Sequence, residues 1–214
     1  MIEIIARDKG GASYEPVPAG NHYAVCYAVI GIGSEVNTFN GNLQQKVMLM
    51  WELVDERMEY QGEDKARVIS KTYTNSLAKN ANLRKDLESW RGREFTEEEA
   101  QGFNICNILG KPCLINTTIE KNSRGYDYAK AGAVTNVPKG MKPEHVPELE
   151  LIAFDISNPE CSIGDLQKLP EWIVERIRQT PEYERRIDAQ VEQRASEITE
   201  EDIAPIESNE DLPF

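Results

Sequence analysis

The chain has 214 residues, of which 40% are hydrophobic, so it is long enough to bury one sizeable core or two small ones. Its formal net charge of −13 would argue against a nucleic-acid partner if that charge were spread evenly along the chain. The four cysteines form no CxxC pair and only two histidines are present, which excludes the usual ligand spacings of a zinc site.

The acidic excess lies entirely in the last third of the sequence. Residues 1–142 hold 18 Lys and Arg against 18 Asp and Glu, whereas residues 143–214 hold 6 against 19. Within the neutral part, residues 65–142 carry 14 basic and 8 acidic groups, and the final residues 192–214 carry 8 acids against Arg194. This asymmetry indicates a polyanion-binding body followed by an acidic interaction tail.

The beginning of the chain and its apolar runs predict a cytoplasmic protein. The start, MIEIIARDKGG, is too short and too charged for a secretory signal. No apolar run approaches the roughly 18–20 residues that a membrane-spanning helix needs. We expect Cys26 and Cys113 to be small core residues in a reducing compartment.

Three strands are predicted first. Small and larger residues alternate in HYAVCYAVIGI (22–32), and apolar residues alternate in KVMLMWELV (46–54). ARVISKTYT (66–74) alternates as well, and turns rich in Gly, Asn and Asp separate the three runs.

The period then changes to that of a helix. Leu83, Leu87 and Trp90 form one apolar stripe over residues 80–92, and Gly92 stands where a helix would end. Thr96 and the acids after it predict the start of a second helix. Strand patterns return at 111–122 and 126–137, joined by the turn NSRG.

Three strands, a helical insert and two further strands predict a mainly β protein: a five-stranded OB-fold barrel with a helix between strands three and four. Pro170 and the apolar spacing after it predict a C-terminal helix over 169–180. We expect three parts, namely a binding domain over 1–140, an arm with this helix over 141–187, and a disordered acidic tail over 188–214.

Basic and aromatic residues share faces in this arrangement, which suits single-stranded nucleic acid. Cations can follow the phosphates while rings stack on bases, a contact worth about 1–3 kcal/mol per base. The expected binding surface combines strand three, the last strand, the two loops that flank an OB-fold groove and the helical insert. The predicted DNA-binding residues are Phe39, Lys46, Arg67, Lys71, Tyr73, Arg84, Arg91, Lys121, Arg124, Tyr126, Tyr128 and Lys130.

The same residues also have purely structural interpretations. The same tyrosines and cations could simply cover a solvated sheet face, and Trp51 and Trp90 fit a core better than a ligand site. Glu63, Asp64 and Lys65 resemble the short acid-x-Lys spacing of some nucleases, but they lie in a polar turn. With no glycine-rich phosphate loop and no nucleophile–base pair, we expect no enzyme activity, no catalytic residue, no metal and no cofactor.

The stretches LRKDLESWRGREFT, NILGKPCLINTTIEKN and LPEWIVERI resemble phage-encoded OB-fold proteins taken to be single-stranded DNA-binding proteins. This similarity extends over about residues 16–180. The resemblance implies a non-enzymatic protein that coats single-stranded DNA during replication, recombination or repair in a bacterial host.

The last residues carry a second resemblance. EDLPF is similar to the C-terminal tip of bacterial single-strand DNA-binding proteins, although Leu stands where Ile is commoner. That resemblance implies that Asp211, Leu212, Pro213 and Phe214 recruit partner enzymes. A function of another class stays open: an OB-like adaptor that binds proteins and not DNA.

Overall fold

The computed structural model describes residues 15–60, 62–141 and 147–197. The chain divides into two compact units. The half-barrel unit comprises Met1–Ile30 and Val47–Ala153, and the helical unit comprises Gly31–Lys46 and Phe154–Phe214. The helical unit thus includes residues 31–46, which the predicted boundary at residue 140 placed in the first part.

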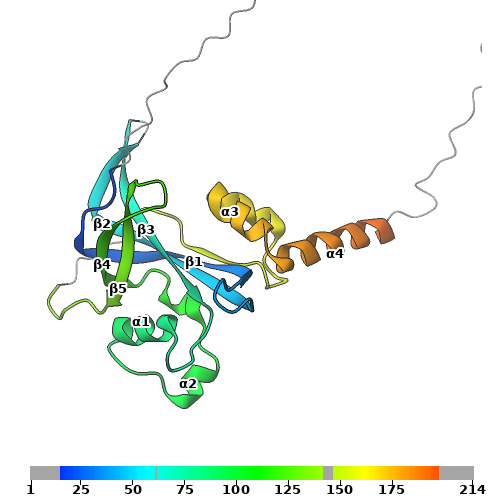
Figure 1. Ribbon diagram of the computed structural model, residues 1–214, viewed down its shortest axis with the longest axis horizontal. Helices are drawn as coiled ribbons and strands as arrows, with labels where there is room; N and C mark the ends of the chain where they lie inside the picture. The colour runs from blue at the N-terminus through cyan, green and yellow to red at the C-terminus, as the bar shows by residue number, and fades with distance from the viewer. Residues whose placement is uncertain (1–14, 61, 142–146, 198–214) are drawn as a thin grey trace, which may run out of the picture. The chain divides into compact units, whose positions relative to one another are not determined.

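Five strands form a curled antiparallel half-barrel (Figure 1), in the order β3-β2-β1-β4-β5. They are β1 (Gly20–Val36), β2 (Leu43–Tyr60), β3 (Glu63–Thr74), β4 (Pro112–Lys121) and β5 (Asp127–Thr135). A short β6 (Ile152–Asp155), which the sequence analysis missed, pairs with β1. The expected mainly β architecture is confirmed, and its strand order is compatible with an OB-fold-like barrel.

The helical insert between β3 and β4 is also confirmed. It contains α1 (Asn82–Arg91), α2 (Glu97–Gln101) and the 3₁₀ turn η1 (Ile105–Ile108). Gly92 ends α1 with a left-handed φ of 69°. Thr96 begins α2 with a capping box, in which its hydroxyl accepts from the Glu99 N–H and the Glu99 carboxylate accepts from the Thr96 N–H.

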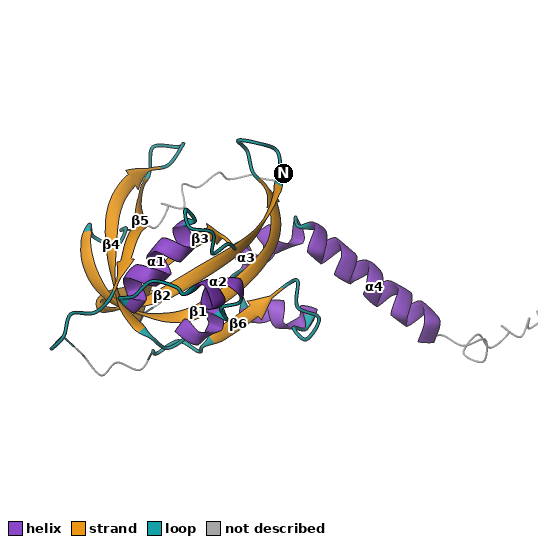
Figure 2. Cartoon of the chain, turned by 90° about the horizontal axis from the view of Figure 1, so that it is seen from below, coloured by secondary structure: helices purple, strands orange, loops and turns teal. Residues whose placement is uncertain are grey.

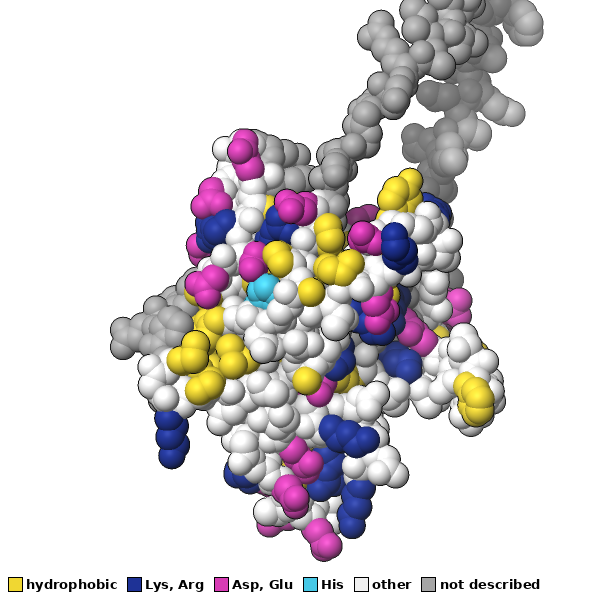
Figure 3. All heavy atoms as spheres, turned by 60° about the vertical axis from the view of Figure 1, so that its left-hand side comes forward, with side chains coloured by type: hydrophobic (Ala, Val, Ile, Leu, Met, Phe, Trp, Pro, Cys, Tyr) yellow, Lys and Arg dark blue, Asp and Glu magenta, His cyan; other side chains and the backbone are white. Residues whose placement is uncertain are grey.

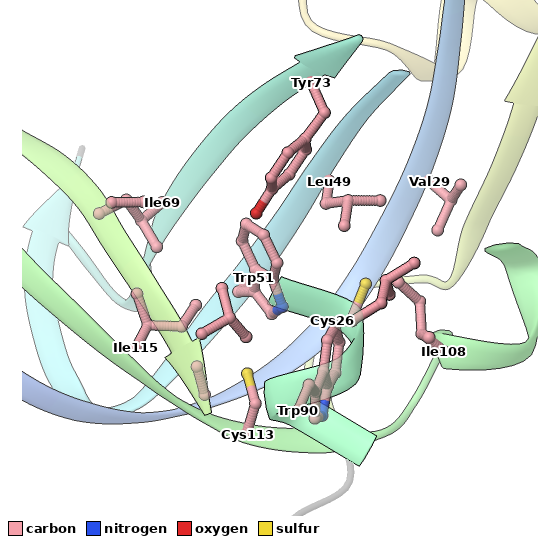
Figure 4. Packing of buried hydrophobic residues seen from close by; sticks show 14 of the residues in the cluster. Cys26, Val29, Leu49, Trp51, Ile69, Tyr73, Trp90, Ile108, Cys113 and Ile115 are labelled. Carbon is pink, nitrogen blue, oxygen red and sulfur yellow. The ribbon is translucent and has the colours of Figure 1, made fainter. Parts of the chain in front are cut away.

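The core of the half-barrel unit lies between the sheet and α1, which packs against the curved strands (Figure 2). Leu83, Leu87 and Trp90 of α1 are buried there, as their spacing predicted. Trp90 meets Trp51 of β2 at a centroid distance of 6.1 Å, and Trp51 is fully buried. Both tryptophans are therefore core residues (Figure 4), because rings of this size gain most free energy when water is removed from them.

The two end strands, β3 and β5, are joined by one polar cluster. The Lys71 ammonium of β3 lies 2.6 Å from Asp86 Oδ2 of α1 and 2.6 Å from the Gly132 carbonyl oxygen of β5. The Tyr73 hydroxyl donates to the same carboxylate oxygen at 2.8 Å. This closure cluster, consisting of Lys71, Tyr73, Asp86 and Gly132, links three elements that lie far apart in the sequence.

The helical unit packs helices on the outer end of β1. It contains η2 (Ile163–Lys168), α3 (Glu171–Arg178) and α4 (Pro181–Glu197). Arg176 of α3 binds Glu35 with two hydrogen bonds of 2.5 and 2.9 Å, and Glu182 of α4 accepts from the Ser34 N–H and hydroxyl. Gly33 has a φ of 105°, and a Cβ there would lie 2.8 Å from Thr180 Oγ1, so only glycine fits this contact.

The C-terminal helix prediction needs two corrections. The helix expected over 169–180 is α3, and a further helix, α4, follows it directly. The expected disorder from residue 188 is wrong for residues 188–197, which continue α4. Pro181 suits a helix start, and good helix formers continue the segment although few of its residues are apolar. Residues 198–214 lie outside the described residues.

Replacing Asp86 with alanine should lower the free energy of unfolding by about 1–3 kcal/mol, because it leaves the half-buried Lys71 ammonium and the Tyr73 hydroxyl without their shared acceptor. Urea denaturation followed by circular dichroism measures the change. Asp188→Ala, at an exposed carboxylate of α4, is the matched control and should change stability by less than about 0.5 kcal/mol. Equal stability of the two variants would show that the closure cluster does not hold the sheet.

Candidate nucleic-acid interface

The β4–β5 hairpin carries the best-defined group of exposed basic and aromatic side chains. Its turn is held by Asn122, whose side-chain oxygen accepts from the N–H groups of Arg124 at 2.9 Å and Tyr126 at 3.0 Å. Gly125 has a φ of 82°, which the tight turn requires. The turn NSRG was predicted from the sequence, and the structure confirms it between the two strands.

Three predicted site residues lie at the tip of this hairpin in contact with solvent. The Tyr126 side chain is 70% exposed, Arg124 is exposed, and the Lys121 side chain is 73% exposed. Among the described residues, neither the Arg124 guanidinium nor the Tyr126 ring has a hydrogen-bond, ion-pair or ring partner. These groups can meet a ligand without first breaking an internal contact.

The register of the two strands separates the remaining hairpin residues onto two faces. Glu120 pairs with Tyr128 and Thr118 pairs with Lys130, so these four share one face. Lys121 pairs with Asp127 on the other face, where their charges lie 3.4 Å apart. The sequence predicted one basic and aromatic surface, whereas the hairpin presents two sides and a tip.

Glu120 weakens the positive charge of its face. It accepts from the Lys130 ammonium at 2.8 Å and from the Tyr128 hydroxyl at 3.1 Å. The Lys130 ammonium lowers the pKa of Glu120, and Glu120 in turn raises the pKa of Lys130. The carboxylate is thus ionised at neutral pH, and Lys130 is partly compensated before any ligand arrives.

The structure does not favour the predicted role of β3 in binding, because its three predicted site residues are buried or held by internal contacts. Tyr73 is 3% exposed and points into the core toward Trp51 (Figure 4), so its ring cannot stack on a base. Lys71 is held in the closure cluster. Arg67 donates to the carbonyl oxygens of Arg57 and Glu15, and only 12% of its side chain is exposed.

The sequence predicts the alternation of side chains in β3 correctly. The face that was expected to meet a ligand is turned toward the core instead of toward solvent. Ile69 lies on the same face as Arg67, Lys71 and Tyr73 and is buried, which was the available signal. The counter-charge that permits Lys71 on an inner face is Asp86 of α1, fifteen residues away. The sequence of β3 alone does not reveal that Asp86 is the partner of Lys71.

Two predicted arginines of the helical insert hold the insert together. Arg84 binds Glu88 and the carbonyl oxygens of Leu77 and Phe95. Arg91 binds Glu99 at 2.7 Å and lies over the Phe95 ring at 4.2 Å. Only 14% and 16% of the two side chains are exposed, so both are structural in this fold.

Phe39 and Lys46 belong to the helical unit. Phe39 is 96% exposed at the tip of the β1–β2 hairpin, and its N–H donates to the Asn37 side chain at 2.8 Å. Lys46 is half-buried and donates to Gln44 at 2.9 Å. Their contact with nucleic acid stays a prediction. The tip residues Asp211, Leu212, Pro213 and Phe214 lie outside the described residues, and so does their expected role.

The segment that resembled a nuclease motif lies at a solvated hairpin end. Glu63, Asp64 and Lys65 are exposed at the start of β3. Lys65 pairs with Glu63 at 2.8 Å, and Asp64 pairs with Arg57 at 3.0 Å. Within residues 15–60, 62–141 and 147–197, no group of three His, Cys, Asp or Glu is placed to hold a metal ion.

Comparison with known proteins assigns no family: no protein-family model matches the chain, and no curated protein matches its sequence. In the part of the chain that the structure describes, no helix is both long enough and apolar enough to cross a membrane.

Tyr73→Phe should be less stable than the unmodified protein at pH 8, and the difference should shrink above about pH 10, where tyrosines of the unfolded chain ionise. Burial first, and then the negative charge of Asp86, raise the pKa of Tyr73, so its folded-state contribution is present below the unfolded pKa and lost above it. Urea midpoints at several pH values measure the difference. A gap that stays constant to pH 11 would contradict the burial of this hydroxyl.

Proposed function

We propose that this protein binds single-stranded nucleic acid without enzymatic activity, through the tip and the Tyr128–Lys130 face of the β4–β5 hairpin. The observation that carries the proposal is the turn at Asn122, which binds the backbone N–H groups of Arg124 and Tyr126 and leaves both side chains exposed to solvent. Cations beside an exposed aromatic ring supply the two contacts that single strands offer, phosphates and base faces.

The finer fold assignment belongs to the same proposal. We take the half-barrel as an OB-fold in which β3 and β5 meet through the closure cluster. In that fold the loop between strands four and five flanks the ligand groove, which is the position of the Asn122 turn. Both the strand order and the helical insert between β3 and β4 support this assignment.

The charge distribution supports a nucleic-acid ligand over a purely protein ligand. Residues 65–142 carry 14 basic against 8 acidic groups, although the chain as a whole is strongly acidic. Recognition would be largely independent of sequence, because phosphate contacts and stacking read no base edges. The resemblance noted above places such a protein in phage-type replication or recombination, with partner enzymes recruited by the tip.

Replacing both Arg124 and Tyr126 with alanine should raise the Kd for a labelled oligo-dT about tenfold or more at low salt. One stacked base contributes about 1–3 kcal/mol, and 1.4 kcal/mol corresponds to a factor of ten. Fluorescence anisotropy measures the Kd, and the slope of log K against log salt should fall by about one phosphate contact. Lys168→Ala, at an exposed cation of η2, should bind as the unmodified protein does.

No oligonucleotide binding by the unmodified protein at low salt would refute the proposal and favour the protein-binding adaptor. Unchanged binding by the Arg124 and Tyr126 double variant would place the interface elsewhere on the molecule.

Glu120→Gln should tighten binding of the same oligonucleotide by severalfold. The substitution removes a carboxylate from the ligand-facing side of the hairpin and leaves the Lys130 ammonium uncompensated, while an amide oxygen can still accept from Tyr128. Asp165→Asn, which removes a carboxylate paired with Lys168 in η2, is the matched control and should leave the Kd unchanged. Weaker binding by Glu120→Gln would mean that the ion pair positions the hairpin for the strand.

A further inference from the structure

The helical insert contains a pocket that the proposed function does not use. It has a volume of about 390 Å³, within the usual range for small-molecule sites. We call it the insert pocket, and its lining residues are Trp90, Arg91, Arg93, Glu99, Phe103, Asn107, Ile108 and Lys111. We propose that the insert pocket binds a nucleotide, with the base against its aromatic wall and the phosphate at its basic rim.

Two contacts hold the aromatic side chains of the wall in place. The Trp90 indole N–H donates to the Pro112 carbonyl oxygen at 2.7 Å. Phe103 packs edge-on against Phe95 with ring centroids 5.1 Å apart. A flat base that contacts the half-buried Phe103 would therefore meet a ring that already has a fixed position, which reduces the entropy lost on binding. Trp90 contributes only the 7% of its surface that is exposed.

The rim carries more positive than negative charge. Among the residues that line the pocket, three are basic (Arg91, Arg93 and Lys111) and one is acidic (Glu99). Arg93 first, and then the Thr96 N–H and Arg91, lower the pKa of Glu99 to about 2, so the carboxylate is already committed to these partners. Within the described part of the chain, the enclosed Arg91 Nη1 has no hydrogen-bond acceptor.

Lys111 is placed at this rim by the backbone and not by a side-chain partner. Its N–H donates to the Ile108 carbonyl, its carbonyl accepts from the Cys26 N–H at 3.2 Å, and the preceding Gly110 N–H donates to the Cys26 carbonyl at 2.8 Å. The ammonium is exposed and contacts no acceptor among the described residues. A phosphate could take that position without displacing a carboxylate.

The aromatic wall and the basic rim together indicate which class of ligand fits the pocket. A simple anion would leave the wall of Trp90, Phe103 and Ile108 unused, and an uncharged apolar ligand would leave the cations unused. A nucleotide uses both, and Asn107 at the rim offers an amide to a base edge. Basic and acidic side chains intermingle over the lower part of the molecule in Figure 3, where α1 and α2 lie. This inference rests on the proposed function, because the single-stranded nucleic acid that binds the hairpin could also supply the nucleotide for the pocket.

The test uses Trp172→Phe as the background, because Trp172 is the half-exposed tryptophan of the helical unit and would add unrelated signal. Thymidine 5′-monophosphate should quench the remaining fluorescence, which comes from Trp51 and Trp90, in a saturable way. Thymidine without the phosphate should quench less at equal concentration. Replacing Arg93 and Lys111 together with alanine should weaken the monophosphate at least fivefold. Lys79→Ala with Lys85→Ala removes two exposed cations outside the pocket and should have no effect.

Two further measurements separate the pocket from the hairpin. The Arg124 and Tyr126 double variant should keep monophosphate binding, and its loss there would overturn a pocket in the insert. The Arg93 and Lys111 double variant should lower the salt dependence of binding to a long oligo-dT more than that to a short one, if the strand supplies the nucleotide. If this variant binds every oligonucleotide as the unmodified protein does, although its binding of the monophosphate is weakened, free nucleotides are the ligand of the pocket.

Three outcomes overturn the inference. The first is oligo-dT binding by the unmodified protein without quenching by the monophosphate, which would leave the proposed function standing. The second is equal quenching in the pocket variant and its control. The third is quenching by the peptide Glu-Asp-Leu-Pro-Phe but not by the monophosphate, which would identify the pocket as a protein-docking site.

Discussion

The ammonium group of Lys71, shared between a carboxylate and a carbonyl oxygen, joins the two end strands of the sheet. Asp86 supplies the carboxylate from α1, and Gly132 supplies the carbonyl from β5. A lysine on an inner face is costly to desolvate, so it stabilises the fold only while both acceptors are in place. The cluster thereby ties both α1 and β5 to β3. Arg67 and Lys71, the two cations of β3 that the sequence assigns to a ligand, therefore make contacts that stabilise the fold.

We therefore propose binding at side chains that the fold itself does not use. The β4–β5 hairpin extends beyond the core, and Asn122 gives its turn a fixed shape without using the side chains of Arg124 or Tyr126. Glu120 and Asp127 form ion pairs with Lys130 and Lys121 and so reduce the positive charge of the hairpin. In the insert, Arg91 holds two phenylalanine rings, while Arg93 and Lys111 remain at the rim.

The sequence predicted local features well because their causes are local. The stop at Gly92, the cap at Thr96 and the turn after Asn122 each depend on residues within a few positions. The inward face of β3 was missed because it depends on Asp86, which only the packed α1 brings near. Residues 188–197 were missed as helix because composition favours disorder, whereas α4 starts from Pro181 in a segment of good helix formers. The insert pocket could not be foreseen, since η1 and α1 meet only in three dimensions.

The central claim is that single strands contact the β4–β5 hairpin and not the inner face of β3. Photo-crosslinking to an oligonucleotide that contains 5-bromodeoxyuridine, followed by peptide mass spectrometry, tests it most directly. The account predicts adducts on the peptide that carries Tyr126 and Tyr128, and none on the peptide that carries Tyr73. Adducts on Tyr73, or no adducts anywhere at low salt, would contradict it.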